Sequence, residues 1–542
     1  AAPPGLAVAL LHGYKFPAHE ERVAALAREA GFSQVSISSA TVPLVKIVGR
    51  GDTTVVDAYL SPILRRYVRQ VSGELQGVED LQFMQSNGGL STADLFRGKD
   101  AILSGPAGGI VASVKTAVEA GHGKVVTFDM GGTSTDVAHY SGSYERTYDS
   151  IVAGVRVRAP MMEIHTVASG GGSVCYFDGQ RYRVGPESAG ADPGPCAYRK
   201  GGPLTITDCN VMTGKLQPDF FPSVFGPHQD QPLDKEATER KFRALAGEIS
   251  VAAGDERAPE AVAEGFLKVA VDQMANAIKK ISVQRGYDVT GYTLLCFGGA
   301  GGQHACLVAK TLGISKVYVH PLSGVLSAYG IGLADVIALR EKTVEKALAA
   351  EHFAEVLRFL EALEGEAREA LAKQKADGES IQVVKKLLIR YAGTDTPLPV
   401  NFVQDVGQLT STYHALHYQQ FGFALEDRDL IVETALVEAI STSDVRVGRA
   451  TATAAQPTAT QPTAGAEEPP EATPERVTKV YFEGRWRDTG IYIFEKLARN
   501  ALIEGPAIIV EKVGTTIVEP GWHVSVLESG MELTRAEEKG KG

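Results

Sequence analysis

The stretch KVVTFDMGGTSTDV at residues 124–137 decides how the rest of the chain is interpreted. Its first five residues predict a buried strand, and the strand runs into a turn at Gly131 and Gly132. Because these two glycines carry no Cβ atom, successive backbone N–H groups can point at one anion. Hydroxyl donors follow at Thr133, Ser134 and Thr135. The stretch therefore predicts a site for a phosphate group at the end of a strand.

Two carboxylates, Asp129 and Asp136, flank this turn. They would repel a bare phosphate, but they suit a phosphate that arrives with Mg²⁺, which is held by one or two carboxylates together with substrate phosphates. The pattern therefore indicates a loop for a magnesium-bound nucleotide. The alternative is a tight β-hairpin in which Asp and Thr only help to form the turn.

A second glycine cluster, FGGAGGQH at residues 297–304, follows the predicted strand 294–297 and precedes a predicted helix over 305–312. A glycine turn that opens a helix lets the backbone approach a ligand, and the helix N-terminus favours anions. Close packing of the helix on the strand would account for the same glycines. The cluster lacks the acidic residue of a dinucleotide-binding fold and the Gly-Lys-Ser/Thr of a P-loop.

Three further segments are rich in glycine. Simple backbone geometry is enough to account for SGPAGG at 104–109 and for SGGGS at 169–173. Residues 185–195 are different, since this long Gly/Pro segment carries Glu187 and Asp192. Eleven such residues with two acids are typical of an active-site loop.

Composition excludes several classes of protein. The 542 residues carry 54 Lys+Arg against 65 Asp+Glu, and no basic stripe stands out, so a surface for nucleic acid or for an anionic membrane is not expected. No apolar run approaches the roughly 18 residues of a membrane helix. The five cysteines form no CxxC pair and suit reduced thiols, so we expect a cytoplasmic protein.

Strands and helices alternate along most of the chain, which predicts an α/β fold. A strand over 6–11, a helix over 17–30 with Val23, Leu26, Ala27 and Ala30 on its apolar face, and a strand over 35–38 indicate a parallel pair. Further helices are expected over 53–71, 264–285 and 343–375, and further strands over 81–85, 124–128 and 294–297. Residues 451–475 contain five prolines and no large apolar residue, which predicts a disordered linker. The alternation of apolar and polar residues over 477–534 predicts a small β-rich module.

The order of these motifs resembles the second half of an actin/Hsp70/sugar-kinase-type ATPase. In that superfamily a connecting helix, a second phosphate loop, an adenosine loop and a second connecting helix follow one another, and here they match SGPAGGIVASVKTA (104–117), VVTFDMGGTSTDV (125–137), LLCFGGAGGQHACLVAKTLG (294–313) and PLSGVLSAYGIGLADV (321–336). Other segments look like the hydantoinase A/5-oxoprolinase family, and most like its 5-oxoprolinase branch: RGDTTVVDAYLSPILRRYV (50–68), VGPESAGADPGPCAYRKGGP (184–203), TITDCN (205–210), FGPHQDQPL (225–233) and RYAGTDTPLPV (390–400).

The resemblance implies an ATP-dependent opening of a cyclic amide, in which 5-oxo-L-proline becomes L-glutamate with Mg²⁺ and a monovalent cation such as K⁺. Phosphorylation of the carbonyl oxygen would activate a poor electrophile, and the protein would position and neutralise the γ-phosphate. By the motifs, Asp129 would orient Mg²⁺ or its water and Asp136 would support the loop. Nucleotide contacts would come from Gly131, Gly132, Thr133, Thr135, Gly298, Gly299, Gly301 and Gly302. Glu187, Asp192 and Asp208 are assigned to substrate contacts only because they lie in acidic segments.

The resemblance also implies how the chain is divided. We expect the remainder of lobe I over 1–100, lobe II with the nucleotide loops over 101–340, an α/β region over 341–450, the linker over 451–475 and the β-rich module over 476–542. The family has a first phosphate loop at its N-terminus and a hydantoinase B-like half, and neither is present in this sequence. We therefore expect a fragment or subunit that hydrolyses ATP inefficiently alone. We also expect a hydantoinase B-like half or subunit as its partner, and a homo-oligomer.

Two other functions remain open. One is that of an N-methylhydantoinase or acetone carboxylase A-type subunit, which would use the same ATP loops on a different substrate. The other is a non-catalytic, nucleotide-binding scaffold of the actin/Hsp70 type, because a fold alone does not determine chemistry.

Overall fold

The structure of the chain is a computed structural model that describes residues 5–75, 77–78, 80–374, 381–442, 470 and 472–536. Two compact units divide these residues, and each unit is assembled from separate stretches of the chain. The first unit contains residues 1–112, 145–163 and 330–448, and the second contains 113–144, 164–329 and 449–542. Residues 451–469 and 471 of the predicted linker lie outside the described residues. No helix in the described ranges is long and apolar enough to span a membrane.

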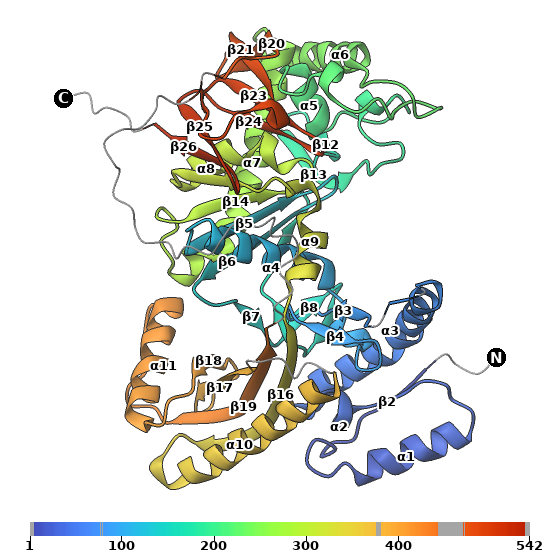
Figure 1. Cartoon of the computed structure of the whole chain (residues 1–542), viewed down its shortest axis with the longest axis vertical. Helices are drawn as coiled ribbons and strands as arrows, with labels where there is room; N and C mark the ends of the chain where they lie inside the picture. The colour runs from blue at the N-terminus through green and yellow to red at the C-terminus, as the bar shows by residue number, and fades with distance from the viewer. Residues whose placement is uncertain are drawn as a thin grey trace. The chain divides into compact units, whose positions relative to one another are not determined.

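The first unit begins with the predicted strand–helix–strand arrangement (Figure 1). Strands β1 (Leu6–Val8) and β2 (Val35–Ile37) are parallel and are joined by helix α1 (Ala18–Glu29), which confirms the prediction. The predicted apolar face of α1 is only partly correct, since Ala27 is buried but Val23, Leu26 and Ala30 are exposed, and Glu20 is buried. The Glu20 carboxylate accepts hydrogen bonds from the Leu10 N–H, the Ser39 N–H and the Ser38 hydroxyl, which offset the cost of its burial.

A six-stranded sheet forms the centre of the first unit. Its strands, in spatial order, are β18 (Leu398–Asn401), β17 (Ile381–Tyr391), β19 (Leu430–Ser441), β16 (Val336–Ala347), β4 (Leu90–Thr92) and β3 (Gln82–Met84). Besides α1, this unit contains the helices α2 (Ser38–Thr41), α3 (Ile47–Glu74), α10 (Ala350–Lys373) and α11 (Val406–Phe421). Short strands complete it, namely β7 (Arg146–Thr147), β8 (Ser150–Val152), β9 (Val155–Val157) and β10 (Met161–Met162).

The predicted helix over 343–375 starts too early. Residues 343–347 belong to β16, where Thr343 pairs with Thr434 and Ala347 pairs with Ile431 of β19. Pairing along this long strand overrides the helical propensity of a charged, Ala-rich segment. The helix α10 then begins at Ala350 and packs on β16 and β19.

The second unit is built on an eight-stranded sheet with a parallel centre. In spatial order its strands are β11 (His165–Val167), β6 (Thr135–Ser141), β5 (Lys124–Met130), β14 (Thr293–Phe297), β15 (Lys316–Val319), β26 (Gly530–Arg535), β25 (Trp522–Leu527) and β22 (Leu502–Glu504). Strands β5, β14 and β15 run parallel, so the carboxyl ends of β5 and β14 lie at the same edge of the sheet. Both glycine clusters follow strands, as the sequence predicts, and the structure shows that these two strands are adjacent.

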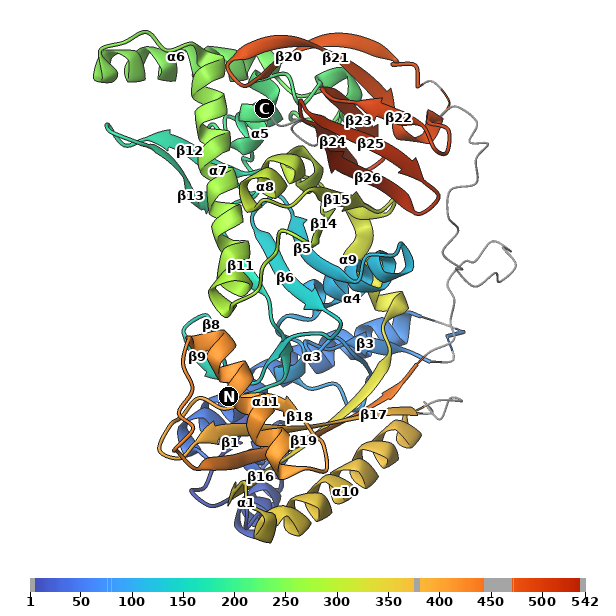
Figure 2. The same cartoon turned by 90° about the vertical axis from the view of Figure 1, so that its left-hand side faces the viewer.

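Helices carry much of the apolar core of the second unit. They are α5 (Ile206–Met212), α6 (Lys235–Ala253), α7 (Pro259–Ile281) and α8 (Ala305–Leu312), beside the hairpin of β12 (Ser173–Phe177) and β13 (Tyr182–Ser188). Figure 2 shows α7 as a long helix beside β6 and β11. Helices α4 (Ser104–Glu119) and α9 (Leu326–Leu333) each contain a point at which the chain passes from one unit to the other.

The predicted β-rich module is present, and it shares its strands with the second unit's main sheet. Strands β20 (Arg476–Phe482), β21 (Arg485–Ile493), β23 (Ala507–Glu511) and β24 (Gly514–Val518) form a sheet of their own. Strands β22, β25 and β26 instead extend the eight-stranded sheet, because β26 pairs antiparallel with β15. Trp522, Val524 and Leu533 consequently belong to the same apolar core as α7 and β14.

Candidate nucleotide site

The stretch 124–137 forms a β-hairpin whose turn is held from behind by another loop. Strands β5 and β6 pair along their length, with Asp129 opposite Asp136. The N–H groups of Gly171 and Gly172 donate to the carbonyls of Gly131 and Gly132, at 3.1 and 2.6 Å. The glycine-rich segment 169–173, which backbone geometry alone could account for, is thus the support of the turn.

The front of the turn is open to a ligand. Gly132 and Thr133 are exposed, and their backbone N–H groups donate to no acceptor among the described residues. Thr135 differs from its neighbours in being fully buried, and its hydroxyl donates to the Ser169 carbonyl. The segment therefore does form a tight β-hairpin, as the alternative interpretation expects. The tip of this hairpin nevertheless presents free N–H donors.

Asp129 and Asp136 lie side by side at the end of the hairpin. Burial, and then the charge of Asp136, raise the pKa of Asp129 to about 7, while a contact with the Ser327 hydroxyl opposes the shift. Burial also raises the pKa of Asp136, against a 2.6 Å hydrogen bond from the Thr166 hydroxyl. Two adjacent carboxylates of this kind favour a proton or a cation between them.

The second glycine cluster meets the first at Asp129. Gly298 has a φ of +81°, and any side chain at this position would collide with the Asp129 carboxylate and the Met130 carbonyl. The Ala300 N–H then donates to the Met130 carbonyl at 3.0 Å. Gly301 and Gly302 serve packing, since a Cβ atom there would lie 2.8 Å from Cys296 Sγ and 2.6 Å from Thr516 Oγ1.

The loops enclose a cavity of about 270 Å³. Backbone of the two glycine clusters and of the segment 169–173 forms one side, and apolar and aromatic side chains form another. The lining residues are Gly131, Gly132, Gly171, Gly172, Gly190, Pro195, Tyr198, Thr207, Leu216, Phe220, Phe221, Pro222, Gly299, Ala300, Gln303, Glu511, Lys512, Val513, Gly514 and Thr515. Open N–H groups beside flat apolar surfaces suit a ligand with a phosphate at one end and an aromatic base at the other.

The three acids assigned to substrate have different surroundings. Glu187 is exposed on β13, and Asp192 is exposed with an ion pair to Lys200 at 3.7 Å. Asp208 is fully buried in α5, and burial raises its pKa. Its carboxylate accepts hydrogen bonds from the N–H groups of Cys196, Ala197 and Thr205, and from the Thr205 hydroxyl. The structure does not bring these three side chains together.

The Asp pair fits a magnesium ion that comes with phosphate. Among the described residues no group of three or more His, Cys, Asp or Glu side chains is placed to hold a metal ion, so a cage made of protein ligands alone is not seen there. Mg²⁺ needs only one or two carboxylates when phosphates complete its shell. The raised pKa of Asp129 and the adjacent charge of Asp136 show that this pair would gain from a nearby cation.

Two family models match the chain over nearly its whole length. Residues 50–340 match the hydantoinase/oxoprolinase model, and residues 343–531 match the hydantoinase/oxoprolinase C-terminal domain. The chain belongs to the hydantoinase/oxoprolinase family. It therefore has the actin/Hsp70-like ATPase fold that the order of its motifs predicts.

Curated relatives in this family include two enzymes named 5-oxoprolinase. The chain is 41% identical over 544 residues to 5-oxoprolinase 1 of Arabidopsis thaliana and 40% identical over 531 residues to 5-oxoprolinase of Saccharomyces cerevisiae. Both alignments cover 97% of this chain, which spans 42% and 41% of the two relatives. The crystal structure of an ATP-dependent caprolactamase from Pseudomonas jessenii matches with a TM-score of 0.83 and 28% identity, over 98% of this chain and 77% of that one.

Part of the cavity wall in this family member is formed by a region that contains none of the sequence motifs described above. The turn between β23 and β24, residues 511–515, lines the cavity 380 residues after the phosphate turn. Glu511 is buried there, where it accepts hydrogen bonds from the Ser323 and Thr516 hydroxyls. A Glu-Lys-Val-Gly turn between two short strands carries no sequence pattern that would distinguish it from any other hairpin.

Proposed function

We propose that the chain is the ATP-binding part of an enzyme that opens 5-oxo-L-proline to L-glutamate. The observation that carries the proposal is the exposed turn with free N–H groups, which lies beside Asp129 and opens into a cavity with aromatic walls. The 40% and 41% identity to enzymes named 5-oxoprolinase supports this substrate over other cyclic amides.

The chemistry follows from the weakness of a lactam carbonyl as an electrophile. Its oxygen takes the γ-phosphoryl group as the bond to the ADP oxygen breaks. A water molecule then adds to the activated carbon, and the C–N bond breaks as nitrogen takes a proton. A second water molecule releases phosphate from the acyl phosphate and leaves L-glutamate.

The residues of the chain have separate tasks in this scheme. The Gly132 and Thr133 N–H groups would hold phosphate oxygens, and the segment 169–173 keeps the turn in place. Asp129 would hold Mg²⁺ directly or through water, and the ion would supply charge neutralisation at the phosphates. Asp136, held by Thr166, would fix the position of Asp129. A monovalent cation and a hydantoinase B-like partner remain part of the proposal.

The first test concerns nucleotide binding, and it uses Gly132→Ala. A Cβ atom at Gly132 would meet no protein atom within 4 Å, so the variant should fold as the original chain does. It would project into the space in front of the turn, and we expect the affinity for a fluorescent ATP analogue to fall by about tenfold or more. Gly291→Ala, at an exposed glycine with equal space and no place in the cavity, is the matched control.

The second test concerns turnover. Phosphate and glutamate release are measured with 5-oxoproline, hydantoin, caprolactam and acetone, with and without a hydantoinase B-like partner. We expect stimulation by 5-oxoproline in the presence of the partner and its loss in Asp129→Asn. Stimulation by hydantoin or acetone alone would assign the chain to those branches. Nucleotide binding without stimulation by any substrate would identify a scaffold.

A further inference from the structure

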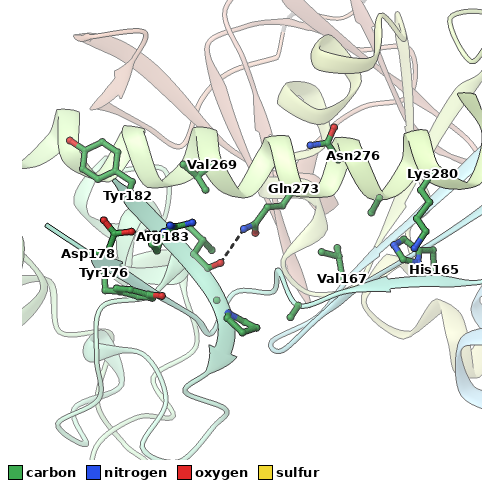
Figure 3. Close-up of a pocket in the computed structure, with 15 residues that line it drawn as sticks. His165, Val167, Tyr176, Asp178, Tyr182, Arg183, Val269, Gln273, Asn276 and Lys280 are labelled. Carbon is green, nitrogen blue, oxygen red and sulfur yellow. Dashed lines mark hydrogen bonds and ion pairs between the residues drawn. The ribbon is translucent and has the colours of Figure 1, made fainter. Parts of the chain in front are cut away.

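A second cavity, of about 740 Å³, lies in the second unit on a different set of elements from the nucleotide loops (Figure 3). One face of α7, strand β11 and the β12–β13 hairpin enclose it. The lining residues are His165, Val167, Ala168, Tyr176, Asp178, Tyr182, Arg183, Val184, Gly185, Pro186, Val269, Gln273, Asn276, Ala277 and Lys280. The proposed function uses none of these side chains.

One end of this cavity is basic. Lys280 and His165 lie together there, whereas Asp178 and Arg183 lie at the other end (Figure 3). Within the described part of the chain neither Lys280 nor the His165 ring has a carboxylate or hydrogen-bond partner, and the charge of Lys280 adds to burial in lowering the pKa of His165. Asp178, the only carboxylate among the described lining residues, is already paired with Arg183 at 2.6 Å. The end of the cavity that holds Lys280 and His165 therefore favours an anion.

The middle of the cavity offers amide oxygens. Gln273, Asn276 and Lys280 follow one another on α7 at spacings of three and four residues, which places them on one face of the helix. The Gln273 Nε2 group donates to the Val184 carbonyl at 3.1 Å, and its Oε1 atom has no donor among the described residues. The exposed Asn276 amide has no partner in the described part of the chain either. These acceptors favour a ligand that carries an N–H group.

The remaining walls are apolar. Val167 lies towards the basic end and Val269 lies on the far side of Gln273 (Figure 3), and Val184 and Pro186 also line the cavity. They provide surface for a few methylene groups and no further charge. A ligand that satisfies all three features has a carboxylate, a short aliphatic body and an N–H donor.

We propose that this cavity binds a small carboxylic acid that carries an N–H donor, with Lys280 as the partner of its carboxylate. A cyclic amide acid and the open amino acid formed from it share this chemistry. The choice of these two as probes rests on the proposed function, whereas the site itself rests on the side chains that line the cavity.

Two segments connect this cavity to the nucleotide cavity. Strand β11 lines the second cavity with His165 and Val167, and continues into the loop whose Gly171 and Gly172 line the first. Likewise Gly185 and Pro186 line the second cavity, and Gly190 and Pro195 of the same acidic loop line the first. A ligand in the second cavity would therefore contact the segments that shape the nucleotide site.

The ligand requirement is tested by calorimetric titration of the whole chain without nucleotide. The probes are 5-oxo-L-proline, L-glutamate, 2-pyrrolidinone, which lacks the carboxylate, and tetrahydrofuran-2-carboxylate, which lacks the N–H group. We expect 5-oxoproline or glutamate to bind at least tenfold more tightly than the last two, and the tighter of the pair identifies the source. Equal binding of the four, or binding of none, would overturn the proposal.

Variants of Lys280 locate the site. Its side chain is exposed, so Lys280→Met should leave the fold intact, and we expect binding of the preferred probe to weaken by about tenfold or more. Lys280→Arg should retain most of the affinity. Lys268→Met is the matched control, since Lys268 lies on α7 outside the cavity, exposed and paired with Glu264. Unchanged affinity in Lys280→Met would place the probe elsewhere and refute the site.

Binding of the acid can be tested separately from binding of the nucleotide. Gly132→Ala should weaken binding of the ATP analogue and leave the titration of the acid unchanged. Failure of nucleotide binding would then count against the proposed function alone, and failure of the Lys280 comparison would count against this cavity alone.

Discussion

Asp208 illustrates how a buried carboxylate near a site can stabilise the neighbouring loop without contacting a ligand. It joins the start of α5 to residues 196 and 197, which follow the Gly/Pro segment, and its oxygens accept five hydrogen bonds, the fifth from the Thr238 hydroxyl. All of its acceptor capacity is used inside the protein. Its assignment to a substrate rests only on its place in an acidic segment, and the structure favours an anchor for the loop.

We expect Asp208→Asn to lower the free energy of unfolding by about 2–4 kcal/mol, because an amide would aim N–H groups at backbone donors and leave them unsatisfied. Urea unfolding measures the loss. Asp192→Asn, at an exposed acid in the same loop, should change stability by less than about 0.5 kcal/mol. If Asp208 instead contacts substrate, its variant would keep its stability and raise KM.

At the level of single residues, the sequence predicts positions more reliably than roles. The strand-end glycines and the acids beside them could be located because packing alone seldom requires glycine and aspartate together at the end of a buried strand. The burial of Glu20 and the exposure of Val23 could not be predicted, since they depend on the Leu10 and Ser39 amides and on what α1 packs against. Tertiary partners, rather than local pattern, decide such cases.

Among the elements, the buried pair Lys215–Glu519 connects the segment after α5 to the end of β24. Both side chains are almost fully buried, and the Lys215 ammonium also lies 4.9 Å from the centre of the Phe482 ring. Removal of one partner would leave an uncompensated charge in the core. The pair thus links the C-terminal strands to the helix that supports the acidic loop.

We expect Lys215→Met to lower the free energy of unfolding by about 3–5 kcal/mol, and the double variant Lys215→Met with Glu519→Gln to recover part of it. Urea unfolding of the two variants measures the coupling. Lys479→Met, in the exposed pair with Asp488, should cost less than about 1 kcal/mol. If Lys215→Met were as stable as the original chain, water would have to solvate the Glu519 carboxylate in place of the lost ammonium group.

The sequence predicted some of the helices and strands, and it missed many others together with how they pair. Helix α7 and strand β14 were predictable because their apolar residues repeat at the helical spacing or form a short buried run. The start of α10 was misplaced because residues 343–347 find a partner in β19, which lies about 90 residues further along the chain. The turn at 511–515 reaches the cavity through long-range packing, since β24 packs on α8 and on residues 301–303.

For the molecule as a whole, buried histidines make stability depend on pH. Burial, together with the charge of Lys215, lowers the pKa of His304 to about 3, and burial lowers that of His320 to about 4. Both rings stay neutral in the folded chain while they take up protons near pH 6.5 in the unfolded one. The stability that they contribute is therefore complete above pH 6.5 and is lost as the pH falls towards 4.

We expect the free energy of unfolding to fall by about 2 kcal/mol between pH 7.5 and pH 5 because of His304 alone. His304→Gln should remove this part of the pH dependence, as measured by urea unfolding at the two values. His228→Gln, at an exposed histidine, should keep the slope of the original chain. Equal slopes in all three proteins would show that His304 is protonated in the folded state.

The pairing of β15 with β26 has a consequence for the order of folding. Lys316 pairs with Thr534 and Val319 with Met531, so more than 200 residues are synthesised between the two strands. Until β26 emerges from the ribosome, β15 is an open edge of a parallel sheet, and open edges recruit other chains. Contacts of such wide sequence separation also form slowly. Chains that end before residue 530 should therefore aggregate during synthesis, even though both nucleotide loops are complete by residue 304.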